Sequence, residues 1–244
     1  MFGSVIEITP RRANATADIV MDVVDLECTN EPISFQLNRG EVLGFTGSRT
    51  SGVEEVRDAL TGKRPAPIAS LTVDGRPASI TAPRDLPSLG IAVLTNMLDP
   101  ESEAHAARNI VMLDGEDQVD DEAIEDTTRI LLMLKESEDR MSELLHRPTQ
   151  STGQRRWQQM QEIASQNARI MILIQPTDGL DIATRERFVR LLEEITGRGV
   201  GVLLFTSDER ELHQFSDRVL VMADGGIREE WDTRTITTEA TRGA

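Results

Sequence analysis

Gly47 and Gly52, which follow an apolar strand, are the residues of this chain whose type and spacing point most directly to chemistry. Residues 42–46 form an apolar strand pattern, and a helix-like stretch covers residues 55–60. This is the strand–loop–helix context in which a glycine-rich loop wraps phosphate groups. Such a loop holds a nucleoside triphosphate, with a lysine on the β- and γ-phosphates and a Ser or Thr hydroxyl on Mg²⁺.

The two positions that should supply the lysine and the hydroxyl carry other residues. Val53 stands at the lysine position and Glu54 at the hydroxyl position. One ion pair at contact distance is worth roughly 4 kcal/mol at an effective dielectric typical of a protein surface. Losing the lysine and adding a carboxylate therefore weakens triphosphate binding more than the N–H groups of a helix start should offset. The alternative is that Gly47 and Gly52 are ordinary turn glycines.

Composition excludes several classes of protein. Acidic residues outnumber basic ones 42 to 26, and the net charge of −16 disfavours binding to nucleic acids and other polyanions. Cys28 is the single cysteine, so no disulfide can form within the chain. No stretch approaches the roughly 20 apolar residues that span a bilayer. We expect a soluble protein in a reducing compartment, without a tyrosine to stack on adenine.

The elements that must position this loop alternate between strand-like and helix-like patterns. Apolar runs predict strands at residues 19–27, 33–37, 42–46, 71–73, 78–80, 91–94, 170–174, 200–205 and 219–222. Helical spacing predicts helices at residues 55–60, 154–167, 184–198 and 209–215. The alternation predicts an α/β fold with a mainly parallel sheet and an antiparallel β subdomain, in which residues 19–27 and 33–37 form a hairpin.

Three segments depart from this alternation. Residues 1–18 end in a polar stretch and are predicted to be a linker. Residues 97–150 are acidic and predicted to form a helical subdomain within a main domain that spans residues 19–232. Residues 233–244 are predicted to be a flexible tail.

Further motifs follow the loop in a fixed order. They are Gln-Ser-Thr-Gly-Gln at residues 150–154, an apolar strand with a polar continuation at residues 170–181, Phe-Thr-Ser-Asp-Glu at residues 205–209, and a strand–turn–strand pattern at residues 219–228. In this order the chain resembles an ATP-binding-cassette (ABC) ATPase of the P-loop NTPase class, with its signature loop, Walker B strand, D-loop and switch segment.

The resemblance can be narrowed to one group of transport ATPases. Residues 1–4, 8–12, 40–44, 71–77 and 82–85 are similar to the linker and second cassette of the tandem-cassette subunits of bacterial ribose, galactose and xylose importers. The similarity covers roughly residues 1–232 and implies ATP and Mg²⁺ as cofactors.

The resemblance implies which residues should act on that ATP. Ile174 aligns with the Walker B aspartate that orders Mg²⁺, so no metal ligand is expected there. Gln175 aligns with the catalytic glutamate, but an amide cannot take a proton from water. Ser207 aligns with the switch histidine, and Asn96 with the Q-loop glutamine. Together with Val53 and Glu54, these residues predict degenerate motifs and no hydrolysis at the chain's own site.

The signature loop could still serve a neighbouring cassette. The resemblance implies head-to-tail pairing, in which Ser151, Gly153 and Gln154 of this chain face ATP held by the partner and Asp181 of the D-loop supports the same junction. The alternative is that Ser151 only caps the helix that starts near Gln154.

These expectations combine into one functional prediction with alternatives. We expect a degenerate cassette of a sugar importer, which pairs with an active cassette and contacts a membrane permease from the cytoplasmic face. One alternative is a weakly active ATPase that drives carbohydrate import. Another is a scaffold that has no permease.

Overall fold

A six-stranded sheet lies at the centre of the part of the chain that the computed structural model describes, which is residues 11–95, 168–177 and 182–233. Its strands lie in the order β10 (Gly226–Asp232), β9 (Arg218–Ala223), β3 (Val42–Gly47), β8 (Gly201–Phe205), β7 (Ile170–Ile174) and β6 (Ile91–Leu94). Strands β9 to β6 pair in parallel, and only β10 is antiparallel to its neighbour. The prediction of a mainly parallel sheet is confirmed.

Both faces of this sheet are buried along β3, β6, β7 and β8, which explains the nearly continuous apolar runs in these strands, whereas the edge strand β10 is mostly exposed. On one face, Phe45 and Phe205 stack with ring centroids 4.9 Å apart, within a core shared with the N-terminal strands. Alternate residues such as Leu204 point to the opposite face and join a second core. The period of two in side-chain direction thus divides β3, β6, β7 and β8 between two cores.

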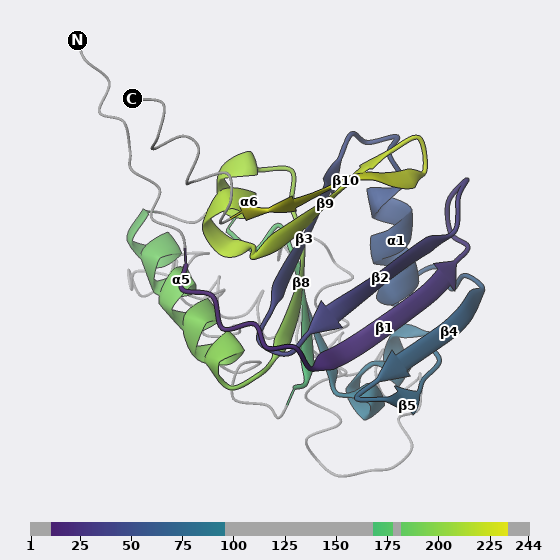
Figure 1. Ribbon diagram of the computed structural model, residues 1–244, viewed down its shortest axis with the longest axis horizontal. Coiled ribbons are helices and arrows are strands. Elements are labelled where there is room, and N and C mark those ends of the chain that lie inside the picture. The colour runs from purple at the N-terminus through teal and green to yellow at the C-terminus, as the bar shows by residue number, and fades with distance from the viewer. Residues whose placement is uncertain (1–10, 96–167, 178–181, 234–244) are drawn as a thin grey trace, which may run out of the picture.

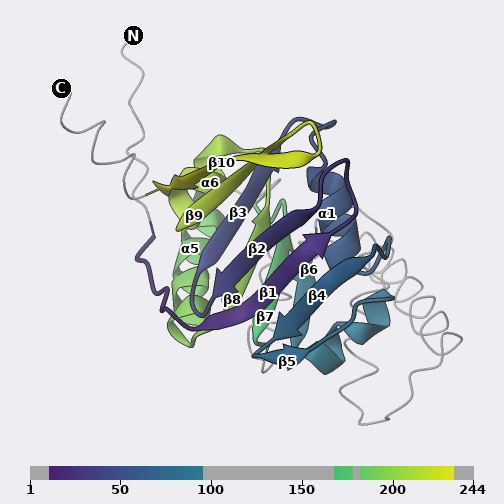
Figure 2. The same cartoon turned by 45° about the vertical axis from the view of Figure 1, so that its right-hand side comes forward.

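A second, antiparallel sheet and helix α1 cover the first face (Figures 1 and 2). The sheet has the order β2 (Ile33–Asn38), β1 (Ile19–Leu26), β4 (Ile68–Val73) and β5 (Arg76–Pro77), and α1 spans Val53–Leu60. The predicted hairpin of β1 and β2 is confirmed. The strand predicted at residues 78–80 is wrong in its bounds, because the two-residue turn at Asp74 and Gly75 brings Arg76 directly opposite Val73.

Helices α5 (Ile182–Gly197) and α6 (Glu209–Phe215) cover the other face. Phe188 of α5 and Phe215 of α6 meet edge to face, with ring centroids 5.2 Å apart. Both predicted helices are confirmed to within two residues. In the described ranges no helix has the length and apolar character needed to cross a bilayer. The predicted helix at residues 154–167 and the predicted helical subdomain lie outside the described residues.

Residues 11–18, which are part of the predicted linker, run along the edge of the molecule towards β1 (Figure 1). The backbone amide of Arg11 donates to the carbonyl of Gln214, and the amide of Thr16 donates to the carbonyl of Arg39. These bonds attach the segment at both ends, first to α6 and then to the turn between β2 and β3.

Candidate functional site

The sheet order brings the predicted site segments of three strands to one edge. β8 lies between β3 and β7, and all three run in the same direction. Their carboxyl ends therefore place the loop after Gly47, the segment with Ser207, and the pair Ile174 and Gln175 side by side. Ligands of open α/β sheets bind at this edge.

Tight packing explains the glycines of the loop between β3 and α1. Gly52 has a φ of +96° and is the N-cap of α1. A Cβ atom there would lie 2.7 Å from Cγ2 of Thr29. A Cβ atom on Gly47 would lie 2.5 Å from the carbonyl oxygen of Met222. Larger residues would displace the β1–β2 loop or β9, so both glycines are required by the fold itself.

The loop also uses part of its hydrogen-bonding capacity internally. The amide of Ser51 donates to the carbonyl of Ser48 at 2.9 Å, and the amide of Val53 donates to Oγ of Ser51 at 3.4 Å. The Ser51 carbonyl accepts from the amide of Gly225 at 3.1 Å, and Ser51 is 1% exposed. Two amides of the loop are therefore directed at the protein's own oxygen atoms.

The side chains at the lysine and metal positions contribute to the core. Val53 and Ile174 are partly buried and pack against the core between the two sheets. Glu54 is exposed and, with Glu55, places two carboxylates in the first turn of α1. Carboxylates stabilise a helix N-terminus, so the chain itself supplies the negative charge that the helix dipole favours.

A polar cluster that the sequence analysis missed lies at the same edge. The Nη2 atom of Arg185 lies 2.9 Å from Oγ1 of Thr177, 3.1 Å from Oδ2 of Asp208 and 3.2 Å from Oε1 of Glu211. Thr177 also donates to Glu211, which is 3% exposed. This Arg185 cluster connects the segment after β7 to α5 and α6.

Asp208 is the charged residue of the Arg185 cluster that faces solvent most. Burial acts to raise its pKa, but hydrogen bonds from the Arg210 amide and the Arg185 guanidinium outweigh burial and lower the pKa below its ordinary value. Asp208 is also the N-cap of α6, where its side chain accepts from the amide of Arg210 at 2.8 Å. An aspartate directly before a helix can be recognised in a sequence as a helix cap. No sequence pattern predicts that the same aspartate pairs with Arg185.

The backbone of Gln175 has a left-handed conformation and is hydrogen-bonded to the end of β8. Its φ is +46°, and its amide donates to the carbonyl of Phe205 at 2.8 Å. This bond aligns the end of β7 with the end of β8, two residues before Ser207.

The remaining predicted site residues belong to segments other than those described above. They are Asn96, Ser151, Gly153, Gln154 and Asp181, all of which lie outside the described residues. Within the described ranges, no group of three or more His, Cys, Asp and Glu side chains could hold a metal ion.

Solved structures with the same architecture identify the fold. The chain superimposes on cbiO1 from Clostridium perfringens, part of the ABC transporter complex cbiONQ, with a TM-score of 0.63, 17% identity, and coverage of 91% of this chain and 92% of that one. The ADP conformation of MJ1267, an ATP-binding cassette of an ABC transporter, gives a TM-score of 0.63 at 16% identity and covers 91% and 96%. The chain has the ATP-binding-cassette fold.

Curated relatives of this cassette are import proteins. It is 29% identical over 238 residues to the "Putative ribose/galactose/methyl galactoside import ATP-binding protein 1" of Burkholderia cenocepacia, covering 90% of this chain and 44% of the relative. It is 29% identical to the ribose import ATP-binding protein RbsA of Shigella dysenteriae, covering 86% and 42%. For the xylose import ATP-binding protein XylG of Burkholderia cenocepacia the identity is 28%, covering 98% and 49%.

The cassette thus spans less than half the length of each of these relatives. No protein-family model matches the chain.

Proposed function

We propose that this cassette belongs to a sugar import system, in which it pairs head to tail with a catalytically active cassette and does not hydrolyse ATP at its own site. The names of the curated relatives, which are import ATP-binding proteins for ribose, galactose and xylose, support the transport role. In this proposal the chain contacts a membrane permease at the cytoplasmic face.

One observation supports the loss of hydrolysis above all others: the positions that should hold the triphosphate and its metal are used for packing. Val53 and Ile174 lie against the core, while Glu54 projects from the start of α1. An ATP phosphate there would meet a carboxylate and no lysine, at roughly 4 kcal/mol for each charge interaction. These residues do not fit a magnesium triphosphate, and Gln175 offers no base for water.

The same proposal assigns a role to the residues outside the described ranges. Ser151, Gly153 and Gln154 would face ATP bound by the partner cassette, with Asp181 beside them. A Ser151→Arg variant is expected to lower the ATPase rate of the assembled transporter, because its larger cation would occupy the position of the hydroxyl. An unchanged rate in the assembled complex would leave Ser151 with only a helix-capping role.

A thermal unfolding experiment with and without Mg-ATP tests whether the chain has lost nucleotide binding at its own site. Ligand stabilisation follows RT ln(1 + [L]/Kd), so millimolar Mg-ATP bound with micromolar affinity would add about 4 kcal/mol. We expect no shift for the unmodified chain and a measurable shift for the Val53→Lys/Glu54→Thr variant, which restores both lost groups. A Val53→Lys variant alone separates the two contributions.

The alternative function, a weakly active ATPase, predicts the opposite result. The melting temperature of the unmodified chain would then rise with Mg-ATP, and the pure protein would hydrolyse ATP at a measurable steady-state rate. A thermal shift would contradict the loss of nucleotide binding, and turnover would contradict the loss of hydrolysis.

A further inference from the structure

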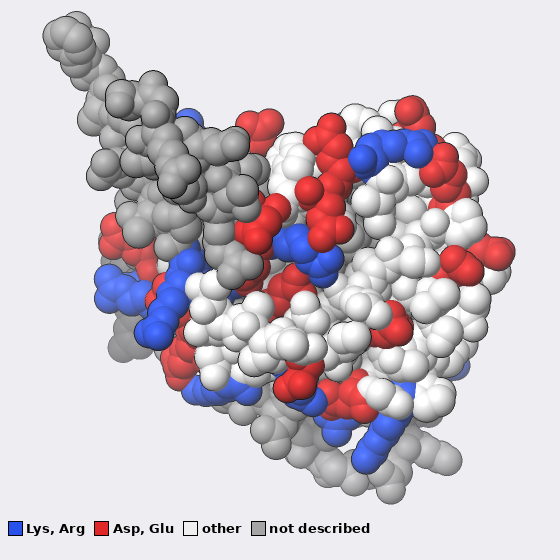
Figure 3. All heavy atoms as spheres, in the orientation of Figure 1, with Lys and Arg blue, Asp and Glu red and all other residues white. Residues whose placement is uncertain are grey.

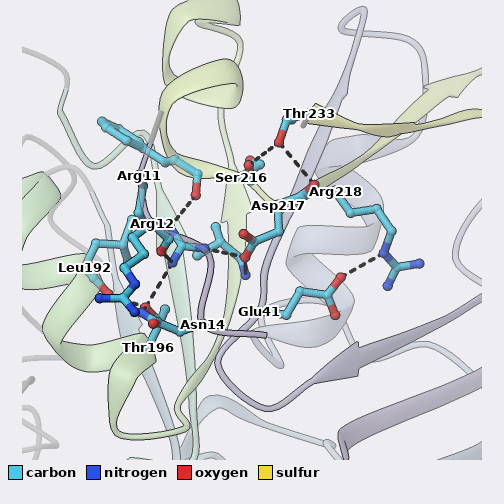
Figure 4. Close-up of polar contacts among 12 residues, drawn as sticks. Arg11, Arg12, Asn14, Glu41, Leu192, Thr196, Ser216, Asp217, Arg218 and Thr233 are labelled. Carbon is cyan, nitrogen blue, oxygen red and sulfur yellow. Dashed lines mark hydrogen bonds and ion pairs between the residues drawn. The ribbon is translucent and has the colours of Figure 1, made fainter. Parts of the chain in front are cut away.

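Two arginines hold opposite ends of the α5–α6 pair. The Arg185 cluster joins the N-terminal ends of the two helices, as described above. At the C-terminal ends, Arg11 of the N-terminal segment lies between α5, α6 and the start of β9 (Figure 4). Between these two arginines, the rings of Phe188 and Phe215 connect the helices.

Arg11 makes contacts in several directions at once. Its Nε donates to the Phe215 carbonyl at 2.9 Å, its Nη1 donates to Oγ1 of Thr196 at 3.0 Å, and its Nη2 pairs with Asp217. The side chain of Arg11 is only 1% exposed. Because the guanidinium group is planar and its donors are fixed in direction, one side chain fixes the relative position of all three elements.

Asn14 strengthens the same attachment. Its Nδ2 donates to Oγ1 of Thr196 at 3.0 Å and to the carbonyl of Glu193 at 3.1 Å. A Cβ atom on Gly40 would lie 2.5 Å from the Asn14 carbonyl oxygen, so the segment passes closely over the β2–β3 turn. Residues 11–16, which we call the strap, are thus an integral part of the packing at this end of the molecule.

Asp217 extends these contacts to the strand that leads into the glycine loop. Its Oδ2 accepts from the amide of Val42 at 2.9 Å, at the first residue of β3. Further along β3, a Cβ atom on Gly44 would lie 2.8 Å from a methyl group of Leu212 and 2.6 Å from Oγ of Ser216. Helix α6 therefore packs directly on β3, so that a movement of the helix changes its contacts with this strand.

Arg11 and Asp217 form a buried ion pair, and losing either residue would leave the other charge buried without a partner. Burial raises the pKa of Asp217 above its ordinary value, although the charge of Arg11 and the amide of Val42 act in the opposite direction. Removing Arg11 would leave a carboxylate without its cation in a desolvated position.

We propose that the strap is a conformational latch, in which Arg11, acting through α6 and β3, sets the position of residues 206–208 at the opposite edge of the sheet. Helix α6 has seven residues and is bound at both ends, by Arg11 and by the Arg185 cluster. Releasing one end allows the short helix to move as a unit, which then loosens the contacts at its other end. This inference holds whether or not the chain binds nucleotide.

Amide hydrogen exchange of the full chain tests this coupling. Arg11→Gln is expected to speed exchange at residues 206–212 by at least about tenfold, while amides of β1 and β4 stay unchanged. Coupling is reciprocal, so Arg185→Gln should speed exchange at residues 214–217. Arg12→Gln is the matched control, because the Arg12 side chain is exposed.

The double variant Arg11→Gln/Arg185→Gln distinguishes a latch from two independent contacts. A latch predicts a fold-change in exchange that is smaller than the product of the two single effects, because breaking either end already frees the helix. A change confined to residues 214–217 in Arg11→Gln, fold-changes that multiply in the double variant, or an equal response of Arg12→Gln would overturn the proposal.

A charge-neutral variant keeps the test decisive if Arg11→Gln does not fold. Arg11→Met/Asp217→Asn removes both charges and retains an acceptor for the Val42 amide. Faster exchange at residues 206–212 in this variant supports the latch, and exchange equal to that of the unmodified chain overturns it.

Discussion

Residues around the start of α1 combine apolar packing with the two carboxylates of Glu54 and Glu55. Val53 and Cys28 pack against the core on the side where the β1–β2 loop approaches the helix. Glu55, which influences Cys28 electrostatically, has an Oε2 atom with no hydrogen-bond partner among the described residues. Such surroundings disfavour any additional anion, including a thiolate as well as a phosphate.

The Cys28 thiol is therefore expected to react slowly. Burial, together with the charge of Glu55, raises its pKa from 9.0 to about 11. At pH 8 the thiolate fraction of the folded protein should be about a hundredfold lower than that of the unfolded chain. Because the thiolate is the nucleophile, the rate of alkylation should fall with this fraction. Iodoacetamide labelling with and without urea measures the difference, and Glu55→Gln should speed labelling of the folded protein. Equal labelling rates in the two states would contradict this prediction.

The same shift has a consequence for stability. The folded state holds the Cys28 proton more tightly than the unfolded state does. The resulting contribution to the free energy of unfolding is fully present below pH 9 and is lost as pH rises towards about 11. Urea unfolding of the unmodified chain and of Cys28→Ser, compared across this pH window, measures the loss. A stability difference between the two proteins that is constant from pH 8 to pH 11 would argue against it.

Alanine substitutions at Gly52 and Gly75 distinguish the cost of backbone strain from the cost of a steric clash. Both have positive φ, +96° and +70°, but a Cβ atom would touch Thr29 only at Gly52, while no atom lies within 4 Å at Gly75. Gly75→Ala is expected to cost about 1 kcal/mol of unfolding free energy, from strain alone. Gly52→Ala adds overpacking and is expected to cost about 2–4 kcal/mol. Chemical denaturation measures both, and equal losses would show that the Thr29 contact relaxes freely.

At the scale of elements, the stability of helix α6 depends on the contacts at its two ends, because the helix is only seven residues long. Helices this short are marginal without tertiary contacts. Asp208 caps its first turn, and the amide of Ser216 closes its last turn on the carbonyl of Leu212. The position of α6 over Gly44 then follows from packing on β3.

Loss of the Asp208 cap is expected to destabilise the fold measurably. Asp208→Ala should cost about 1 kcal/mol, the usual value for an N-cap, whereas Asp208→Asn should retain the cap and lose only the charge. Urea unfolding at pH 7 measures both variants. Glu186→Gln serves as the control, because its side chain is exposed and lies beyond the first turn of α5.

The charge of Asp208 predicts a pH dependence with a defined sign. Hydrogen bonds lower its folded pKa, so the advantage of the aspartate over an asparagine at this position is present above the unfolded value near 4 and disappears as pH falls through the lower folded value. The stability difference between the unmodified chain and Asp208→Asn should therefore shrink between pH 5 and about pH 2. A difference that stays constant over this range would show that the carboxylate charge contributes nothing.

At the scale of the whole molecule, net charge is the dominant electrostatic property. On the face shown in Figure 3, acidic side chains are spread over the surface instead of forming one patch. With a net charge of −16, mutual repulsion opposes the compact state. Raising ionic strength from 0.01 M to 0.15 M shortens the Debye length from about 30 Å to about 8 Å.

The melting temperature is accordingly expected to rise by a few degrees over this range of salt, as about 1 kcal/mol of repulsion is screened. Sodium chloride and choline chloride should act equally, because screening depends on ionic strength and not on the cation. A melting temperature that falls with both salts would show that the surface ion pairs outweigh the repulsion.

Local sequence patterns determined most of the secondary structure of the described residues and the chemical character of the glycine loop. Alternating apolar residues predicted β1 and its hairpin partner β2, helical spacing predicted α5, and the residue types at positions 53 and 54 excluded a lysine and a hydroxyl. These features depend on residues close together in the chain, so local periodicity and identity suffice to predict them.

Only the tertiary structure revealed the two arginine attachments. Arg11 and Asp217 are separated by 206 positions, and neither lies in a pattern that predicts a partner. Arg185 likewise reaches Glu211 across 26 positions. Polar partners of this kind are selected by the packing of α5 and α6 on the sheet, which buries one carboxylate of each attachment, Asp217 for Arg11 and Glu211 for Arg185. The buried environment, and not the local sequence, made each pairing necessary.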